Sequence, residues 1–262
     1  MKKLLILSLA ALLIFGTLAA SCKPKPSGAD ANTLIVGLDD SFPPMGYDDA
    51  NGQIVGFDID LAKAAAKKAG MDIKLQPIAW DSKDSELDSG NINCIWNGFS
   101  ITDARKNSYE WTSPYMKNRQ IMVVLDSSSY TKLSDLAGKS IAVQDGSSAN
   151  DALDSAKAFK DSLKEVVLKA DNQSALMELQ AGAVQGVLMD EVVARYNIEK
   201  LGAKLRMLDE SLADEVFGVA FKKGNSALRD KIEGALKAMA DDGTMAKISK
   251  DWFGEDVTIF GK

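Results

Sequence analysis

The sequence predicts an α/β protein whose parallel β-sheets are covered by helices. From Thr33 onward, short β-prone apolar runs alternate with segments whose apolar residues recur at helical spacing. Such alternation of strands and helices is typical of parallel sheets that are covered by helices. The chain has 262 residues, of which 46% are hydrophobic and 26% charged, and it carries no internal repeat. This composition is ordinary for a globular protein, and the length allows one large or two modest domains.

The elements are expected in a regular order. The chain begins with a strand at 33–38, a helix with one apolar face at 58–69 that Gly70 can cap, and a strand at 71–78. Periodicity alone does not separate one sheet from two, although 133–139 resembles the opening of a second domain. Further strands are predicted at 92–96, 120–125, 140–144, 165–168, 184–189 and 216–221, and further helices at 150–157, 172–180, 191–200 and 226–241.

Charge and composition exclude several classes of function. The formal net charge is -6, which argues against nucleic acid as a partner, because such a partner requires a basic face. The chain contains no histidine, which removes Ser-His-Asp and Cys-His nucleophile activation and every zinc site that depends on imidazole. We therefore expect no catalytic residues, no metal and no cofactor.

The first 21 residues have the pattern of an export signal peptide. Two lysines at positions 2 and 3 precede an apolar run at 4–20, and small residues follow. Leu18-Ala19-Ala20-Ser21-Cys22 resembles a bacterial lipobox, which implies cleavage before Cys22 and lipidation of its thiol. Secretion with an ordinary cut and an uncleaved anchor are the alternatives. Residues 22–32 then form a polar, lipid-anchored linker.

Cys94 is the other cysteine of the chain. It lies in the apolar run 92–96, which predicts a buried structural thiol rather than a reactive one.

Polar side chains follow several of the predicted strands. Ligands of open α/β folds bind at the carboxyl ends of strands, so these loops are where a site is expected. Asp39 to Met45 follows the first strand and contains Pro43-Pro44. The segment is either a turn with a buried Phe42 or a rigid loop that presents Asp39 and Phe42 to a cleft.

The loop at 97–105 carries a possible anion site. Gly98 permits close approach of the backbone, and Ser100 and Thr102 precede Arg105. Hydroxyls, N–H groups and a guanidinium at one loop would bind a carboxylate. Alternatively, Thr102 caps a helix and Arg105 is a surface charge.

Two later loops complete the candidate site. Gln144 to Ser148 follows a strand and opens a helix, whose N-terminus favours anions. Asp190 directly follows an apolar strand. It is either a helix N-cap or a carboxylate aimed at an ammonium group.

Taken together, these segments resemble the bacterial extracellular solute-binding proteins of polar amino-acid ABC transporters. The likeness covers about 33–262, essentially the whole chain after the linker. Its markers are Asp39-x-x-Phe42-Pro43-Pro44-Met45, Gly56-Phe57-Asp58-Ile59-Asp60, Gly98-x-Ser100-Ile101-Thr102-x-x-Arg105, Leu136-Ala137-Gly138-Lys139, Val187-Leu188-Met189-Asp190 and Trp252-Phe253-Gly254. The stretch around Asp58 is expected to be structural, the start of a helix.

The resemblance implies a two-lobed periplasmic-binding-protein fold of type II, with two α/β lobes joined by two crossing strands. Lobe 1 would hold 33–116 and 217–262, and lobe 2 would hold 117–216. The implied protein is not an enzyme. It is a monomer in the cell envelope, anchored to a lipid membrane on the periplasmic side or the outer face of the cytoplasmic membrane. It binds a free amino acid and delivers it to a permease.

The resemblance also assigns roles to residues. Arg105 would bind the ligand α-carboxylate, assisted by the Ser100 hydroxyl and by N–H groups near Thr102 and Ser148, and its partner would be the ligand. Asp190 would take the α-ammonium together with the Gly98 carbonyl. The remaining positions are the aromatic walls Phe42 and Trp80, the side-chain-reading residues Asp39, Gln144 and Asn97, and Ser147 beside Ser148.

Asp39 and the neutral Gln144 favour a basic or amide side chain in the ligand, since an acidic one would be buried against Asp39. Cystine and histidine stay open as ligands. The bulky Trp96, a departure from the family pattern, could reshape this pocket. The alternatives in function are an enzyme on the same fold, similar to cyclohexadienyl dehydratases, and a surface adhesin or sensory lipoprotein.

Overall fold

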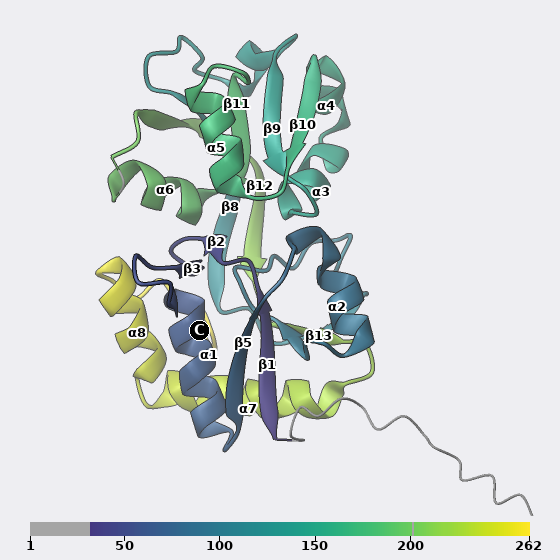
Figure 1. Ribbon diagram of the computed structural model, residues 1–262, viewed down its shortest axis with the longest axis vertical. Coiled ribbons are helices and arrows are strands. Elements are labelled where there is room, and N and C mark those ends of the chain that lie inside the picture. The colour runs from purple at the N-terminus through teal and green to yellow at the C-terminus, as the bar shows by residue number, and fades with distance from the viewer. Residues whose placement is uncertain (1–31, 201) are drawn as a thin grey trace, which may run out of the picture. The chain divides into compact units, whose positions relative to one another are not determined.

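Two five-stranded β-sheets with flanking helices organise the residues that the computed structural model describes, 32–200 and 202–262 (Figure 1). The predicted signal peptide at 1–21, the lipidation site Cys22 and nearly all of the linker at 22–32 lie outside the described residues. The described part confirms the predicted α/β class and the arrangement as two lobes joined by two strands.

The first sheet, with its helices, is called lobe 1 below. Its strand order is β5-β1-β6-β13-β7, with β1 parallel to β5 and β6, and β13 antiparallel to β6 and β7. Helices α1, α7 and α8 pack on one another, and α2 contacts β1, β6 and β13. The bounds are β1 Thr33–Leu38, α1 Phe57–Lys68, β5 Asp72–Pro77, α2 Lys83–Ser89, β6 Cys94–Ile95, β7 Tyr109–Trp111, β13 Ala220–Lys222, α7 Ser226–Asp241 and α8 Thr244–Phe253. A small sheet of β2 Ser41–Phe42, β3 Gly46–Asp48 and β4 Ile54–Val55 follows β1, and a short 3-10 helix η1 Trp80–Ser82 precedes α2.

The second sheet, with its helices, is called lobe 2. Its strand order is β10-β9-β11-β8-β12; β9 is parallel to β10 and β11, whereas β8 is antiparallel to its neighbours. The bounds are β8 Met116–Leu125, η2 Leu133–Leu136, β9 Ser140–Gln144, α3 Ser148–Ser155, α4 Lys157–Ser162, β10 Glu165–Lys169, α5 Asn172–Gln180, β11 Gly186–Asp190, α6 Glu191–Glu199 and β12 Leu205–Phe217.

The strands that carry the predicted site residues are buried throughout. All residues of β9 and β11 are buried, as are the last five of β1. Such continuous burial is expected of parallel strands that are covered on both faces, and it explains their unbroken apolar sequences. Their carboxyl ends therefore deliver Asp39, Gln144 and Asp190 from rigid positions.

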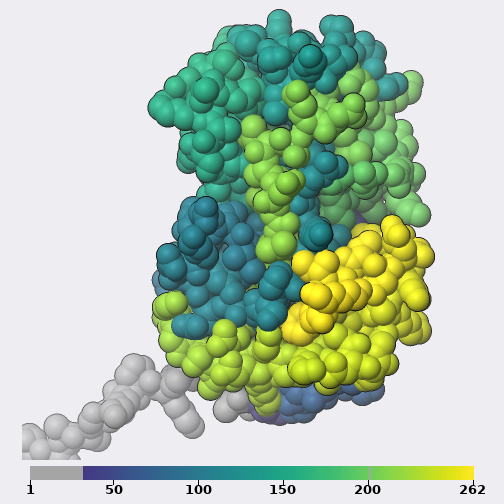
Figure 2. All heavy atoms as spheres, turned by 180° about the vertical axis from the view of Figure 1, so that it is seen from behind, coloured from purple at the N-terminus to yellow at the C-terminus, as the bar shows by residue number. Residues whose placement is uncertain are grey.

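Strands β8 and β12 run between the two lobes. They pair from Met116–Phe217 to Leu125–Leu205, with register shifts near Ser211. Figure 2 shows the molecule from behind, with β12 as yellow-green spheres on that face. The prediction of one strand at 216–221 is wrong. These residues belong to two separate strands, the end of β12 and the start of β13. Strand β8 begins at Met116 and β12 ends at Phe217, and the lobe boundaries at 116/117 and 216/217 stay a prediction.

Two smaller expectations concern burial. Cys94 is fully buried, and burial raises the pKa of its thiol. Trp96 is also fully buried, and it packs near Tyr115 in the lobe 1 core.

In the described part of the chain, none of the helices has the length and apolar character needed to cross a membrane.

The start of α1 requires a glycine. Gly56 has φ +147, and a Cβ there would lie 2.2 Å from the Met45 carbonyl oxygen. We predict that Gly56→Ala lowers the free energy of unfolding by about 2 kcal/mol or more, measured by urea denaturation. Gly70→Ala is the control: φ is +64 but the space is open, so it should cost only about 1 kcal/mol. Equal losses would contradict the role of the close contact.

Candidate functional site

The predicted site residues converge on one cavity between the lobes. All of them line it except Ser100 and Thr102, and Phe99 joins them. The free space is about 10 Å³, room for about one water molecule, so an amino acid enters only when the walls move apart. The lining residues are Asp39, Phe42, Trp80, Asn97, Gly98, Phe99, Arg105, Gln144, Ser147, Ser148 and Asp190.

Asp39 and Gln144 face each other across the lobes. Asp39 Oδ2 accepts a hydrogen bond from Gln144 Nε2 at 2.6 Å, and Oδ1 accepts from Ser41 N and Oγ at 2.9 and 2.6 Å. Gln144 Oε1 accepts from Asn172 Nδ2 at 3.0 Å, which fixes the amide orientation. The amide therefore presents its donor side to Asp39.

A buried carboxylate positions the Gly98 loop. Asp58, at the start of α1, accepts from Gly98 N at 2.5 Å and from the Tyr115 hydroxyl at 2.8 Å. Burial raises its pKa to about 7, against the opposing effect of the Gly98 hydrogen bond. A Cβ at Gly98, where φ is +56, would lie 2.9 Å from the Phe42 ring. Asp58 thus has the structural role that was expected of this stretch. Trp96, which could have reshaped the pocket, does not line the cavity.

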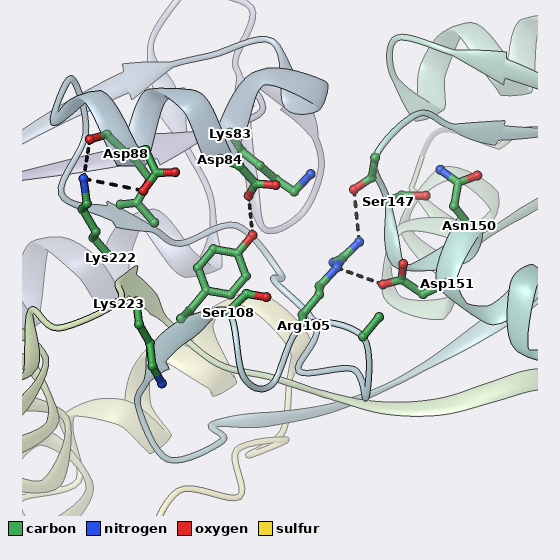
Figure 3. Close-up of a pocket in the computed structure, with 14 residues that line it drawn as sticks. Lys83, Asp84, Asp88, Arg105, Ser108, Ser147, Asn150, Asp151, Lys222 and Lys223 are labelled. Carbon is green, nitrogen blue, oxygen red and sulfur yellow. Dashed lines mark hydrogen bonds and ion pairs between the residues drawn. The ribbon is translucent and has the colours of Figure 1, made fainter.

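Arg105 already has a partner within the chain, contrary to our expectation. Its Nε lies 2.9 Å from Asp151 Oδ2, and its Nη2 donates to the Gly146 carbonyl at 3.1 Å (Figure 3). The Phe99 ring lies 5.0 Å from its guanidinium carbon. Arg105 thus reaches from lobe 1 to α3 of lobe 2.

Thr102 does not start a helix. Its hydroxyl donates to Asp151 at 3.0 Å, and its carbonyl accepts from Arg105 N and Lys106 N in a turn. Thr102 and Arg105 therefore hold the same carboxylate from the other lobe.

Some buried polar groups at the cavity have no hydrogen-bond partner among the described residues. They are the Ser147 hydroxyl and both polar atoms of the Asn97 side chain. Buried polar groups without partners are costly, so these atoms are candidates for contacts with a ligand.

Asp190 and Glu215 form an acidic centre. Asp190 precedes α6 but its side chain does not cap that helix; Oδ1 instead accepts from Asn118 Nδ2 at 2.6 Å and Gln120 Nε2 at 3.0 Å. The same two amides donate to Glu215 Oε2. Burial and then the Glu215 charge raise the pKa of Asp190 to about 8, opposed by Asn118 and Arg105.

Glu215 also explains the position of Ser100. The Ser100 hydroxyl donates to Glu215 Oε2 at 2.6 Å, and Ser148 Oγ lies 3.1 Å from the same oxygen. Glu215 was not expected from the sequence, because it lies in a polar stretch of β12 with no apolar strand pattern before it.

Lys83 is a second residue that the sequence did not indicate. It is 5% exposed, and its ammonium donates to the Trp80 carbonyl at 3.4 Å. Figure 3 shows it pointing across a neighbouring interlobe cavity that Arg105 and Asp151 also line. Burial and then the Arg105 charge lower its pKa. A buried lysine at the start of a helix gives no periodic signal in a sequence.

The site combines a guanidinium, an acidic centre and three aromatic side chains. Residues 34–255 match the model of the bacterial extracellular solute-binding proteins, family 3. The chain belongs to this family. The match covers nearly all described residues, so it includes both lobes and the cavity.

Several family members of known name resemble the chain over most of its length. The L-cystine-binding protein TcyJ of Escherichia coli K12 is 30% identical, covering 87% of this chain and 85% of the relative. The ABC transporter arginine-binding protein 1 of the same strain is 31% identical, covering 97% and 99%. These relatives are named as binding proteins for amino acids.

Solved structures agree in fold. A substrate-binding protein of an ABC uptake transporter from Streptococcus pneumoniae with bound histidine superimposes with a TM-score of 0.84, at 36% identity, covering 87% of this chain and 94% of that one. An ancestral arginine-binding protein bound to glutamine gives 0.79 at 38% identity, covering 87% and 100%. The fold is therefore that of type II periplasmic binding proteins.

The buried carboxyls predict how stability depends on pH. Burial raises the pKa of Asp58 to about 7 and that of Asp190 to about 8, from an ordinary value of 3.8, and the chain has no histidine to titrate in this range. The folded state thus binds more protons than the unfolded state, so stability falls as pH rises from 5 to 8. We expect the melting temperature of the refolded, amino-acid-free protein to fall over this range.

Asp190→Asn should flatten this dependence, because the amide does not titrate. Asp103→Asn is the control: Asp103 is exposed, and Lys106 lowers the pKa of its carboxyl, so it should keep the wild-type slope. A melting temperature that rises toward pH 8, or an unchanged slope in Asp190→Asn, would contradict the assignment.

Proposed function

We propose that this protein binds a basic or amide L-amino acid between its lobes and delivers it to the permease of an ABC transporter. The observation that carries the proposal is the cavity itself, where Arg105 from lobe 1 and Asp190 from lobe 2 line one small space. An α-amino acid offers one anion and one cation, so it matches both. The named relatives bind cystine and arginine, and the solved structures hold histidine, arginine or glutamine.

In this proposal Arg105 binds the α-carboxylate. Its guanidinium has five N–H donors, and the contacts with Asp151 and Gly146 use only some of them. The start of α3 lies beside it, where Ser148 supplies a backbone N–H group, whereas the Ser147 N–H donates to the Gln144 carbonyl at 3.3 Å. The unpartnered Ser147 hydroxyl offers a further donor.

The α-ammonium binds Asp190 and the Gly98 carbonyl. Hydrogen bonds to charged groups contribute roughly 1.5–3 kcal/mol each. A micromolar dissociation constant corresponds to about -8 kcal/mol. A few such contacts, together with burial of the ligand against the aromatic side chains, are therefore enough for micromolar affinity.

The ligand side chain lies near Asp39, Gln144 and Asn97, between the rings of Phe42 and Trp80. A basic side chain would pair with Asp39, replacing the Gln144 hydrogen bond, and would contact aromatic faces. An amide would exchange hydrogen bonds with Asp39 and the Asn97 side chain. Lys83 lines the neighbouring cavity and not this one, and its ammonium lies 5.6 Å from the centre of the Trp80 ring.

Because the carboxylate and ammonium contacts come from different lobes, the ligand stabilises the closed arrangement more than an open one. We propose that the permease recognises this closed form. We further propose that the protein acts as a monomer after export and that two or more acyl chains at Cys22 anchor it to a membrane.

One observation bears on the enzyme alternative. A dehydratase would need a carboxylic acid that stays protonated in the cleft, and the pKa of Asp190, raised to about 8, meets that condition. Product formation from prephenate or arogenate would support this second function. Its absence, with saturable amino-acid binding, supports transport.

Arg105→Ala should abolish amino-acid binding, because the ligand carboxylate loses its cation. It also removes the ion pair with Asp151, so the unfolding temperature must be measured in parallel. Lys106→Ala, which removes the neighbouring exposed cation, is the control and should bind normally. Normal binding by folded Arg105→Ala would contradict the carboxylate role.

Asp39→Asn tests the choice of side chain. It should weaken binding of L-arginine by about tenfold or more, since a charge-assisted contact becomes neutral, and change binding of L-glutamine much less. Isothermal titration of both ligands measures the difference. Equal losses for the two ligands would mean that Asp39 does not read the side chain.

The first experiment is a titration of the protein after unfolding and refolding, which removes any bound amino acid. Calorimetry against the twenty amino acids, ornithine and cystine should show one-to-one binding of a basic or amide amino acid. If none of them binds, the proposed function is wrong.

A further inference from the structure

Glu215 places a second carboxylate beside Asp190. Glu215 lies on the crossing strand β12, two residues before its end, and its side chain is partly buried. Its Oε2 is 2.6 Å from Ser100 Oγ, 3.1 Å from both Ser148 Oγ and Asn118 Nδ2, and 3.0 Å from Gln120 Nε2. The carboxylate thus contacts four polar side chains beside the cavity, while Glu215 itself lines two neighbouring pockets.

The two carboxylates share the same amide donors. Asn118 Nδ2 lies 2.6 Å from Asp190 Oδ1 and 3.1 Å from Glu215 Oε2, and Gln120 Nε2 lies 3.0 Å from each. The carboxylate oxygens are therefore within about 6 Å of one another, close enough for the Glu215 charge to oppose ionisation of Asp190.

The surrounding elements provide little positive charge to relieve this repulsion. On β8, Arg119 is bound by both oxygens of Glu191 at 2.7 Å. From lobe 1, Arg105 is the facing cation, and its Nε pairs with Asp151. The neutral groups against the pair are Ser100, Ser148, Asn118 and Gln120. Asp39 lies across the cavity, where it is hydrogen-bonded to Gln144. Asp214 precedes Glu215 on β12, and Lys117 of β8 lines a neighbouring pocket together with Glu215.

We propose that Asp190 holds a proton beside Glu215, and that the α-ammonium of the amino acid displaces this proton when it binds. This inference rests on the proposed function and adds Glu215 to the ammonium site. The proton leaves a carboxyl oxygen for solvent, and the ammonium keeps its three hydrogens and donates them to the two carboxylates. The charge of the site is unchanged, because one cation replaces another.

The raised pKa of Asp190 agrees with this exchange, since it keeps Asp190 protonated at neutral pH. Binding should therefore tighten as pH rises toward 8, where less free energy is needed to remove the proton. A merely structural Glu215, which tied Ser100 of lobe 1 to Ser148 of lobe 2, would affect stability without any exchange of protons.

The test is calorimetric titration of the full-length, refolded protein with L-arginine and L-glutamine, whose side chains do not titrate between pH 6 and 8. Two buffers of different ionisation enthalpy give the number of protons released. The wild type should release nearly one proton per ligand at pH 6 to 7, and its affinity should rise about tenfold between these values.

Glu215→Gln should release at most about half as many protons at pH 7 and bind at least about tenfold more weakly at pH 8. Asp214→Asn, which removes the exposed neighbouring charge on the same strand, is the matched control and should behave as the wild type. Thermal unfolding of each variant shows whether it is folded.

Wild-type binding without proton release, or Glu215→Gln with wild-type proton release, overturns the inference and leaves the proposed function standing. If the refolded wild type binds neither probe, the proposed function fails, and the inference fails with it.

Discussion

The burial of charged side chains between two lobes is the constraint on which this site depends. Arg105 of lobe 1 reaches Asp151 of lobe 2, and Asp39 of lobe 1 reaches Gln144 of lobe 2. Buried charges are costly unless they are paired, so each lobe needs the other, or a ligand, to satisfy its charges. A zwitterion that enters this space can replace contacts on both sides at once, and this makes binding and closure one process.

The fold makes that constraint workable by placing each charge at the end of a rigid strand. Asp39 follows β1, Gln144 ends β9 and Asp190 ends β11, all of which are buried parallel strands. Asp58 adds a second layer of support, because it holds the Gly98 backbone from within the lobe 1 core. The crossing strands β8 and β12 contribute as well, since Asn118 and Gln120 come from one and Glu215 from the other.

The sequence was informative where one strong local pattern decided the structure. Buried parallel strands gave continuous apolar runs, and the loops after them contained nearly all residues that line the cavity. It was uninformative for β12, where charged residues such as Glu210 and Glu215 interrupt the pattern of a partly exposed strand. Asp151 and Lys83 lie on ordinary helices, and their roles depend on what the other lobe brings near them. Long-range pairing of this kind leaves no periodic trace in a sequence.

A crystal structure of the refolded protein with L-arginine is the most direct test of the account. The account predicts one arginine between the lobes, with its carboxylate on Arg105, its ammonium within hydrogen-bond distance of Asp190, and its guanidinium near Asp39. An arginine bound elsewhere, or bound between the lobes in the reverse orientation with its ammonium away from Asp190, would contradict it.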